Sequence, residues 1–164
     1  MVVPRLRRTV RALVVDPDKR VLLCRFDLPD QGLVVWAPPG GGVEAGETDA
    51  EALARELDEE VGLVLAELTP APLVWTQRVV DAGHAPGFDG VVNDYYLVRS
   101  RHFEPHGSLG AAALSGEFGE LRWWTLAELR SHEGPALFGP RALPTLLAAL
   151  LSDGPPSPTL QLDR

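Results

Sequence analysis

The sequence predicts an α/β fold, a sandwich in which helices cover a mixed β-sheet. Three observations predict it: two β-runs joined by a tight turn, later segments rich in β-branched and aromatic residues, and apolar helical segments between and after them. With 164 residues, 45% of them hydrophobic, the chain can bury a core without disulfides. We therefore expect one domain over residues 1–152.

The first predicted elements form a β-hairpin. Residues 8–15 and 20–26 are apolar β-runs, and the Asp-Pro-Asp sequence at 16–18 between them is a turn former. A short apolar strand then leads through "GLVVWA" into a glycine-rich loop. Further strands are expected, from their β-branched and aromatic content, at residues 72–80, 91–100 and 120–125.

The helix after the glycine loop has clear end signals. Thr48 stands three residues before Glu51, which is a capping box and starts the helix near residue 49, and Gly62 is a natural C-terminal stop. At 100° per residue one apolar stripe faces the sheet. The stripe consists of Ala50, Leu53, Ala54, Leu57 and Val61.

The C-terminal third contains two more helices. Thr125 and Glu128 form a second capping box before a short helix, and the apolar segment 140–154 is predicted to be a helix that covers the sheet. We expect a mobile loop at 102–119, which is rich in Gly, Ala and Ser, and a disordered, proline-rich tail at 153–164.

Composition excludes several functional classes. A net charge of −8 argues against a nucleic-acid polymer as partner, because binding the phosphate backbone depends on many cationic contacts. No apolar stretch reaches the roughly 18 residues of a membrane span, and no secretory leader is evident, so we expect a soluble cytoplasmic protein. The single cysteine, Cys24, lies in an apolar run and is expected to be a buried, reduced thiol.

Three glutamates on the capped helix lack local compensation. Glu56, Glu59 and Glu60 are i, i+3 and i, i+4 neighbours near the helix C-terminus, where both mutual repulsion and the helix dipole disfavour anions. Clustered carboxylates are what a hard divalent cation requires. By contrast, Glu51 caps the helix and Asp58 is expected to face water. These three glutamates, which together form an arc on the helix surface, therefore predict a divalent-metal site.

The glycine loop and the helix together resemble the Nudix box, written G-x5-E-x7-R-E-U-x-E-E-x-G-U, where U is aliphatic. Gly41, Glu47 and the run 55–63, "RELDEEVGL", match every fixed position. The chain is thus similar to the Nudix hydrolase (MutT-like) family. The resemblance implies a Nudix-type α/β/α sandwich with a mixed sheet.

The resemblance also implies an activity. Nudix hydrolases cleave the pyrophosphate bond of a nucleoside diphosphate linked to another moiety X, such as a nucleoside triphosphate, a dinucleotide or a nucleotide sugar. The products are a nucleoside monophosphate and X-phosphate, formed by attack of a water that Mg²⁺ or Mn²⁺ activates. Carried over by position, Glu56, Glu59 and Glu60 are metal ligands, and a carbonyl of Gly40 or Gly41 completes the shell.

Other roles follow from the same resemblance. Glu47 and Arg55 are expected to form the ion pair that holds the loop against the helix. The general base is open between a box glutamate, Glu117 and Glu120, and we favour Glu120. Many relatives are dimers, so a homodimer is a further expectation.

Substrate contacts lie outside the box. Arginines for phosphate and polar or aromatic side chains for the base are the candidates. We select Arg25, Trp36 and Arg78, with Gln77 and Tyr95 as further candidates. The alternative function is a Nudix-fold sensor that binds a nucleotide sugar without cleaving it. Such domains usually lose box carboxylates, and this sequence keeps all of them.

Overall fold

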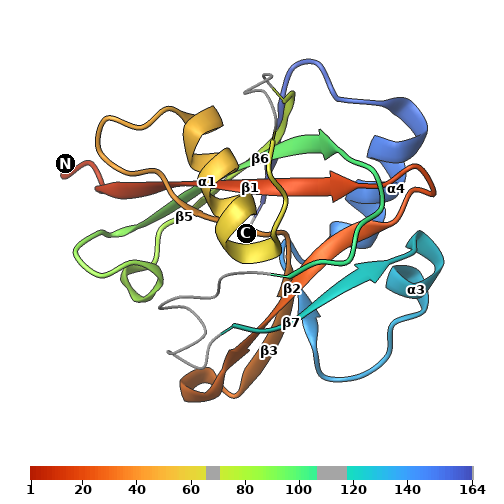
Figure 1. Cartoon of the computed structure of the whole chain (residues 1–164). Coiled ribbons are helices and arrows are strands. Elements are labelled where there is room, and N and C mark those ends of the chain that lie inside the picture. Colours follow the sequence, from red (N-terminus) through yellow and green to blue (C-terminus); the bar gives the residue numbers. More distant parts are fainter. Residues whose placement is uncertain (66–70, 107–117, 164) are drawn as a thin grey trace.

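The computed structural model describes residues 1–65, 71–106 and 118–163 (Figure 1). Its strands are β1 (Leu6–Val15), β2 (Val21–Leu28), β3 (Leu33–Ala37), β4 (Gly40–Gly42), β5 (Leu73–Val79), β6 (Gly90–Arg99), β7 (Phe118–Trp124), β8 (Leu137–Phe138) and β9 (Leu160–Leu162). Its helices are α1 (Asp49–Val61), α3 (Leu126–Ser131) and α4 (Leu143–Asp153), and its short 3-10 turns are η1 (Pro29–Gln31) and η2 (Ala82–His84).

The sheet is mixed, as predicted, and runs in the order β8-β3-β2-β1-β6-β5-β9. The N-terminal hairpin is confirmed, since β1 and β2 are antiparallel and meet at Val15 and Val21. The β1–β6, β3–β8 and β5–β9 pairs are parallel. Farther along β1, the partner is the glycine strand β4, at residues 9–11, while β7 pairs with β2. Beyond the hairpin the sheet therefore divides into two parts, one that continues from β1 through β6 and β5, and one that continues from β2 through β3 and β7.

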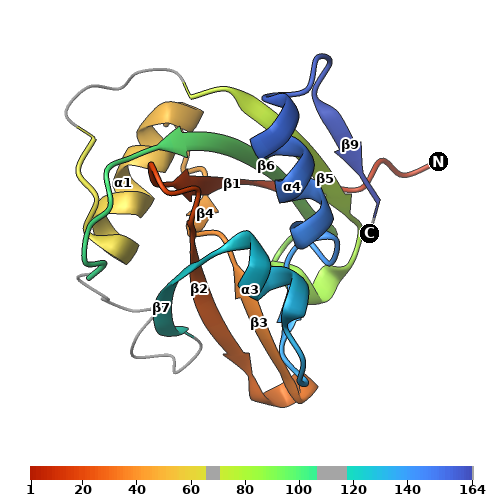
Figure 2. The ribbon, with the colours of Figure 1, turned by 90° about the vertical axis from the view of Figure 1, so that its right-hand side faces the viewer.

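Helices cover both faces of the sheet, which confirms the α/β/α architecture (Figure 2). On one face Leu53, Leu57 and Val61 of α1 join a buried cluster with alternate residues of β1. On the other face the buried leucines of α4 and α3 pack with the remaining apolar residues of β1 and β2; they are Leu129, Leu143, Leu147 and Leu150. The predicted stripe needs one correction: Ala52 is buried, whereas Ala50 and Ala54 are half-buried.

Both predicted capping boxes are confirmed. The Thr48 hydroxyl accepts from the Glu51 N–H at 3.2 Å, and the Thr125 hydroxyl accepts from the Glu128 N–H at 3.1 Å. Gly62 ends α1 in the left-handed conformation, with φ at 74°. These local signals fix where α1 starts and stops, and hence which way its glutamates point.

The prediction of a disordered tail is wrong for part of the segment. Residues 160–162 form β9, which pairs in parallel with β5, and Leu162 packs against the core beside α4. Leu162 gives the segment an apolar side chain to pack despite its prolines, whereas Leu160 is exposed. Most of the predicted mobile loop, 107–117, lies outside the described residues. Cys24 is buried and unpaired, as expected, and none of the described helices has the length and apolarity to cross a membrane.

Candidate active site

Arg55 is the hub between helix α1 and the glycine loop. Its Nε and Nη2 donate to the two carboxylate oxygens of Glu47 at 2.8 and 2.9 Å. Its Nη2 also donates to the Gly42 carbonyl at 3.0 Å, and its Nη1 donates to Glu56 at 2.8 Å. These bonds lower the pKa of Glu47 to about 2 and raise the pKa of Arg55. The bidentate ion pair therefore fixes the loop on the helix.

The glycines of β4 permit a close approach of backbone to carboxylate. A Cβ placed on Gly41 would lie 2.3 Å from Glu56 Oε1, so the carboxylate occupies the space that a side chain would fill. Gly40 has φ at 155°, and a Cβ there would lie 1.9 Å from the Val10 carbonyl oxygen. Only glycine allows this packing of β4 between β1 and α1.

Glu60 is the most perturbed carboxylate of the arc. Its pKa is raised to about 7, chiefly by burial and to a lesser extent by the charges of Glu56 and Glu59, although Arg11 and a hydrogen bond lower it. That bond comes from the Gly40 N–H, which donates to Glu60 Oε2 at 2.9 Å. The protein thus holds an anionic group that its own cations do not fully compensate.

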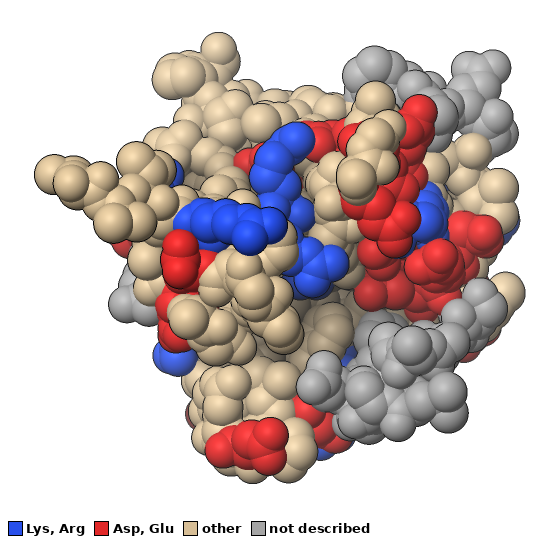
Figure 3. Space-filling view, turned by 90° about the vertical axis from the view of Figure 1, so that its left-hand side faces the viewer, with Lys and Arg blue, Asp and Glu red and all other residues tan. Residues whose placement is uncertain are grey.

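Glu59 completes the arc at its exposed end. Its side chain is 53% exposed and lies 3.6 Å from Arg55 Nη1. Figure 3 shows acidic side chains gathered on one face next to a band of arginines. Within the described residues no three acidic, His or Cys side chains converge tightly enough to form a ready metal cage.

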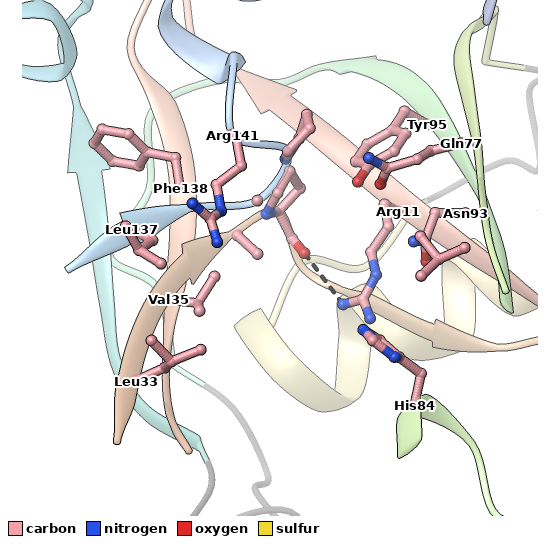
Figure 4. A pocket seen from close by; sticks show the side chains of 15 residues that line it. Arg11, Leu33, Val35, Gln77, His84, Asn93, Tyr95, Leu137, Phe138 and Arg141 are labelled. Carbon is pink, nitrogen blue, oxygen red and sulfur yellow. Dashed lines mark hydrogen bonds between the residues drawn. The ribbon is translucent and has the colours of Figure 1, made fainter. Parts of the chain in front are cut away.

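A cleft of about 320 Å³, drawn in Figure 4, has Arg11 but none of the three arc glutamates in its lining. One wall is polar and comes from β1, β5, β6 and η2; the other is largely apolar and comes from β3, β8 and the segment before α4. The polar wall contains Arg11, Gln77, His84, Asn93 and Tyr95. The facing wall contains Leu33, Val35, Leu137, Phe138 and Arg141, among others. Such a mixture suits a ligand with one polar and one flat apolar part.

Arg11 connects the cleft with the arc. It lines the cleft, and its Nη1 lies 3.4 Å from the carbonyl oxygens of Pro38 and Gly40. Its charge also lowers the pKa of Glu60. Within the described residues Arg11 has no carboxylate in ion-pair contact, so its charge remains available to an anionic ligand.

A comparison with protein families decides the identity of the domain. The model of the NUDIX domain matches residues 5–145. The chain belongs to the NUDIX family. Members of this family are hydrolases that act on nucleoside phosphate anhydrides. The Nudix box is therefore the segment 41–63 described above, and the family resemblance of the sequence is confirmed.

Relatives of known sequence and structure agree with this membership. Nucleoside triphosphatase NudI of Escherichia coli O139:H28 is 43% identical over 74 residues, which are 43% of this chain and 49% of NudI. The chain thus spans about half the length of the curated relatives it matches. The MutT NUDIX hydrolase of Burkholderia pseudomallei has a TM-score of 0.60 at 27% identity, covering 88% of this chain and 97% of that one.

A second solved Nudix structure has the same fold at lower identity. The NUDIX domain of Shewanella oneidensis NrtR, solved with ADP ribose, has a TM-score of 0.63 at 21% identity. It covers 89% of this chain and 88% of that one. The mixed sheet and its covering helices are therefore the fold of the family.

The Nudix box fits a divalent cation. Its donors are hard carboxylate oxygens with glycine carbonyls beside them, and the cradle at Gly41 brings the backbone against Glu56. Glu59 is half-exposed, so its side chain can turn from Arg55 toward an ion. When bound, such an ion supplies positive charge to the phosphates and lowers the pKa of a water.

Three predicted substrate residues lie away from the cleft lining. Trp36 is buried and packs edge-to-face on Trp124, with ring centroids 5.2 Å apart, because its neighbours Val35 and Ala37 take the cleft side of β3. Arg78 is exposed, since Gln77 and Val79 face the cleft and strand residues alternate.

Arg25 also lines no part of the cleft, and its Nε donates to Asp27 at 3.0 Å. The other two candidates, Gln77 and Tyr95, do line the cleft.

Of the two candidate bases outside the box, Glu120 lies within the described residues. Glu120 is exposed on β7 and has no side-chain hydrogen bond or ion pair in the part of the chain that the structure describes. The next residue, Leu121, pairs with Cys24 on β2. Burial raises the pKa of the Cys24 thiol, and the charge of Glu60 adds to this rise. Glu117 lies outside the described residues.

Four polar cleft residues were not predicted from the sequence: Arg11, His84, Asn93 and Arg141. Arg11 carried a usable signal, because it shares a strand face with Leu13 and Val15, and a charged residue on a buried face is unusual. The other three reach the cleft through pairing and turns distant in sequence, for which no local pattern exists.

Proposed function

We propose that this chain hydrolyses a phosphoanhydride bond of a nucleoside triphosphate, giving a nucleoside monophosphate and pyrophosphate. The observation that carries the proposal is that Arg11 lines the cleft and approaches Gly40, whose N–H in turn binds Glu60 of the carboxylate arc. The 43% identity of one segment to a nucleoside triphosphatase supports the same substrate class. The cleft volume, about 320 Å³, is at the low end for ligand sites and suits one nucleoside rather than the two of a dinucleotide.

Each part of the site has a role in this proposal. Glu56, Glu59 and Glu60 hold the cation, and Glu47 with Arg55 keeps the glycine strand in register with them. Arg11 binds a phosphate oxygen and orients the chain of phosphates from the cleft toward Gly40. Glu120 remains our proposed general base.

The direct test is turnover of a substrate panel with Mg²⁺ or Mn²⁺. The panel contains nucleoside triphosphates, dinucleotides and nucleotide sugars, and the products are identified by chromatography. We expect triphosphates to be cleaved fastest, and Glu120→Gln to lower kcat more than KM if Glu120 is the base. Tight binding of a nucleotide sugar without turnover of any compound would instead favour the sensor function.

A further inference from the structure

A segment beyond the family match contributes to the cleft. The NUDIX match ends at residue 145, whereas β9 begins at Leu160 and adds a strand to the edge of β5. Leu160 is in register with Trp75, and Leu162 is in register with Gln77. Leu162 packs against the core, which anchors the segment. Strand β9 is therefore paired beside Gln77, the β5 residue whose amide lines the cleft.

The side chain of Gln77 is hydrogen-bonded to this tail. Its side chain is buried, with 8% exposure, and Nε2 donates to the backbone carbonyl of Asp163 at 2.9 Å. Figure 4 shows the Gln77 side chain turned into the cleft beside Tyr95. An amide whose nitrogen is bound on one side has its orientation fixed, which leaves Oε1 and the second N–H for a ligand.

The amide of Gln77 has a fixed neighbour. Asn93 is its partner in the β5–β6 ladder and also lines the cleft. The buried Thr9 hydroxyl donates to Asn93 Oδ1, so this second amide is held from behind as well. Two oriented amides side by side present donors and acceptors suited to the edge of a heterocyclic base.

The tail also adjoins the opposite wall. Pro140 and Arg141 line the cleft, and they line a second cavity of about 290 Å³ as well. The far side of that cavity is formed by β9 and Asp163. The segment thus adjoins the cleft at two places: it accepts a hydrogen bond from the Gln77 amide, and it shares a cavity with the loop before α4.

We propose that the C-terminal segment, residues 154–163, is a positioning element for substrate recognition. Its Asp163 carbonyl orients the Gln77 amide, and that amide reads the edge of the nucleotide base. This inference rests on the proposed function in one respect, that the cleft takes the nucleoside. Releasing the segment then weakens binding and base discrimination, while the Nudix box and its chemistry stay intact.

A double-mutant cycle tests the inference. Leu162→Asp releases the strand from the core, because it places a charge on a packed position. Gln77→Leu removes the amide at similar volume. Gln161→Asp is the matched control, since Gln161 is exposed on the same strand. Binding is measured by calorimetry with Mg²⁺ and non-hydrolysable α,β-imido triphosphates of adenosine, guanosine, cytidine and uridine.

We expect Leu162→Asp to weaken binding of the preferred analogue about tenfold in the wild-type background, the loss of one hydrogen bond. In the Gln77→Leu background the same change should have almost no effect, and Gln161→Asp should have none in either. An equal loss in both backgrounds would show that the tail acts only through general stability. Deletion of residues 154–164 should reproduce the pattern of Leu162→Asp.

The outcomes separate this inference from the proposed function. If the analogues bind and show the coupling but no triphosphate is hydrolysed, the hydrolase proposal fails and the positioning role stands. If hydrolysis occurs and the coupling is absent, the positioning role is wrong. If no analogue binds, the cleft is not a nucleoside site and the inference is overturned.

Discussion

Arg55 illustrates how one side chain can organise a site without touching the reacting atoms. Its guanidinium bonds to Glu47, to the Gly42 carbonyl and to Glu56, so the loop and the helix share one cation. The carboxylate that faces Gly41 is thereby oriented from the side. A lysine could not replace this fork, because it is a single charge without planar, bidentate geometry.

The ion pair makes the first prediction. Glu47→Gln removes the charge that balances Arg55. Arg55 should then bind Glu56 more strongly and compete with the cation for that carboxylate. We expect kcat/KM to fall about 10- to 100-fold, the usual cost of losing an outer-shell partner. Glu51→Gln is the control, since glutamine also completes a capping box. Equal activity of the two variants would contradict the assigned role.

The turn between β1 and β2 is held by a buried carboxylate. Asp16 Oδ1 accepts from the backbone N–H groups of Asp18 and Arg20 at 3.0 and 2.9 Å. Its Oδ2 accepts from Arg20 Nε at 2.7 Å and from His102 Nδ1 at 2.9 Å. Burial by itself raises the pKa of Asp16, but these donors outweigh it and the pKa is lowered.

The lowered pKa gives a pH dependence. A carboxylate with a depressed folded pKa stabilises the protein above its unfolded value, near 4, and loses that contribution as pH falls through the folded pKa. Asp16→Asn should therefore destabilise the fold by about 1–3 kcal/mol at pH 7. Urea titrations should show the gap to wild type narrowing below about pH 4. A gap that is constant with pH would contradict the charged role of Asp16.

Helix α4 covers the sheet face opposite α1. Leu147 is fully buried there, so Leu147→Ala should cost about 2–5 kcal/mol in the free energy of unfolding. Thr145→Ala, at an exposed position of the same helix, should change it by no more than about 0.5 kcal/mol. Denaturant unfolding measures both. Similar values for the two variants would mean that α4 is not packed as described.

At the scale of the whole molecule, the sheet divides after the hairpin, and the cleft forms where its halves face each other. Local signals predicted the hairpin, the limits of α1 and the glutamate arc, because turns, caps and helical periodicity act over a few residues. The cleft depends on the parallel pairing of β1 with β6, which brings Arg11 next to Tyr95. Sequence alone does not report such long-range register.

The positions of two predicted substrate residues away from the cleft have the same cause. Trp36 and Arg78 are of the right chemical types, but each strand has two faces, and only the packing of its neighbours decides which one meets the ligand. The tail was predicted to be disordered because prolines dominate its composition. Leu162 can pack on the core because the edge of β5 is free to pair with β9, which the local sequence does not indicate.

Metal binding should stabilise the whole fold. A cation that binds the folded chain alone raises stability by mass action, about 2.7 kcal/mol at a hundred times Kd. We therefore expect Mg²⁺ or Mn²⁺ to raise Tm in wild type, and to raise it much less in Glu56→Gln. Differential scanning calorimetry with and without EDTA makes the comparison. No shift in wild type at millimolar ion would contradict a metal site.

The central claim is that the arc on α1 holds the cation for nucleotide hydrolysis. The measurement that tests it most directly is the Mg²⁺-dependent release of pyrophosphate from nucleoside triphosphates by Glu60→Gln and Asp58→Asn. Both variants remove one charge from the same helix, but Asp58 is exposed and lies off the arc. The account predicts a loss of about 100-fold or more in kcat for Glu60→Gln and near wild-type rates for Asp58→Asn. Full activity in Glu60→Gln would contradict it.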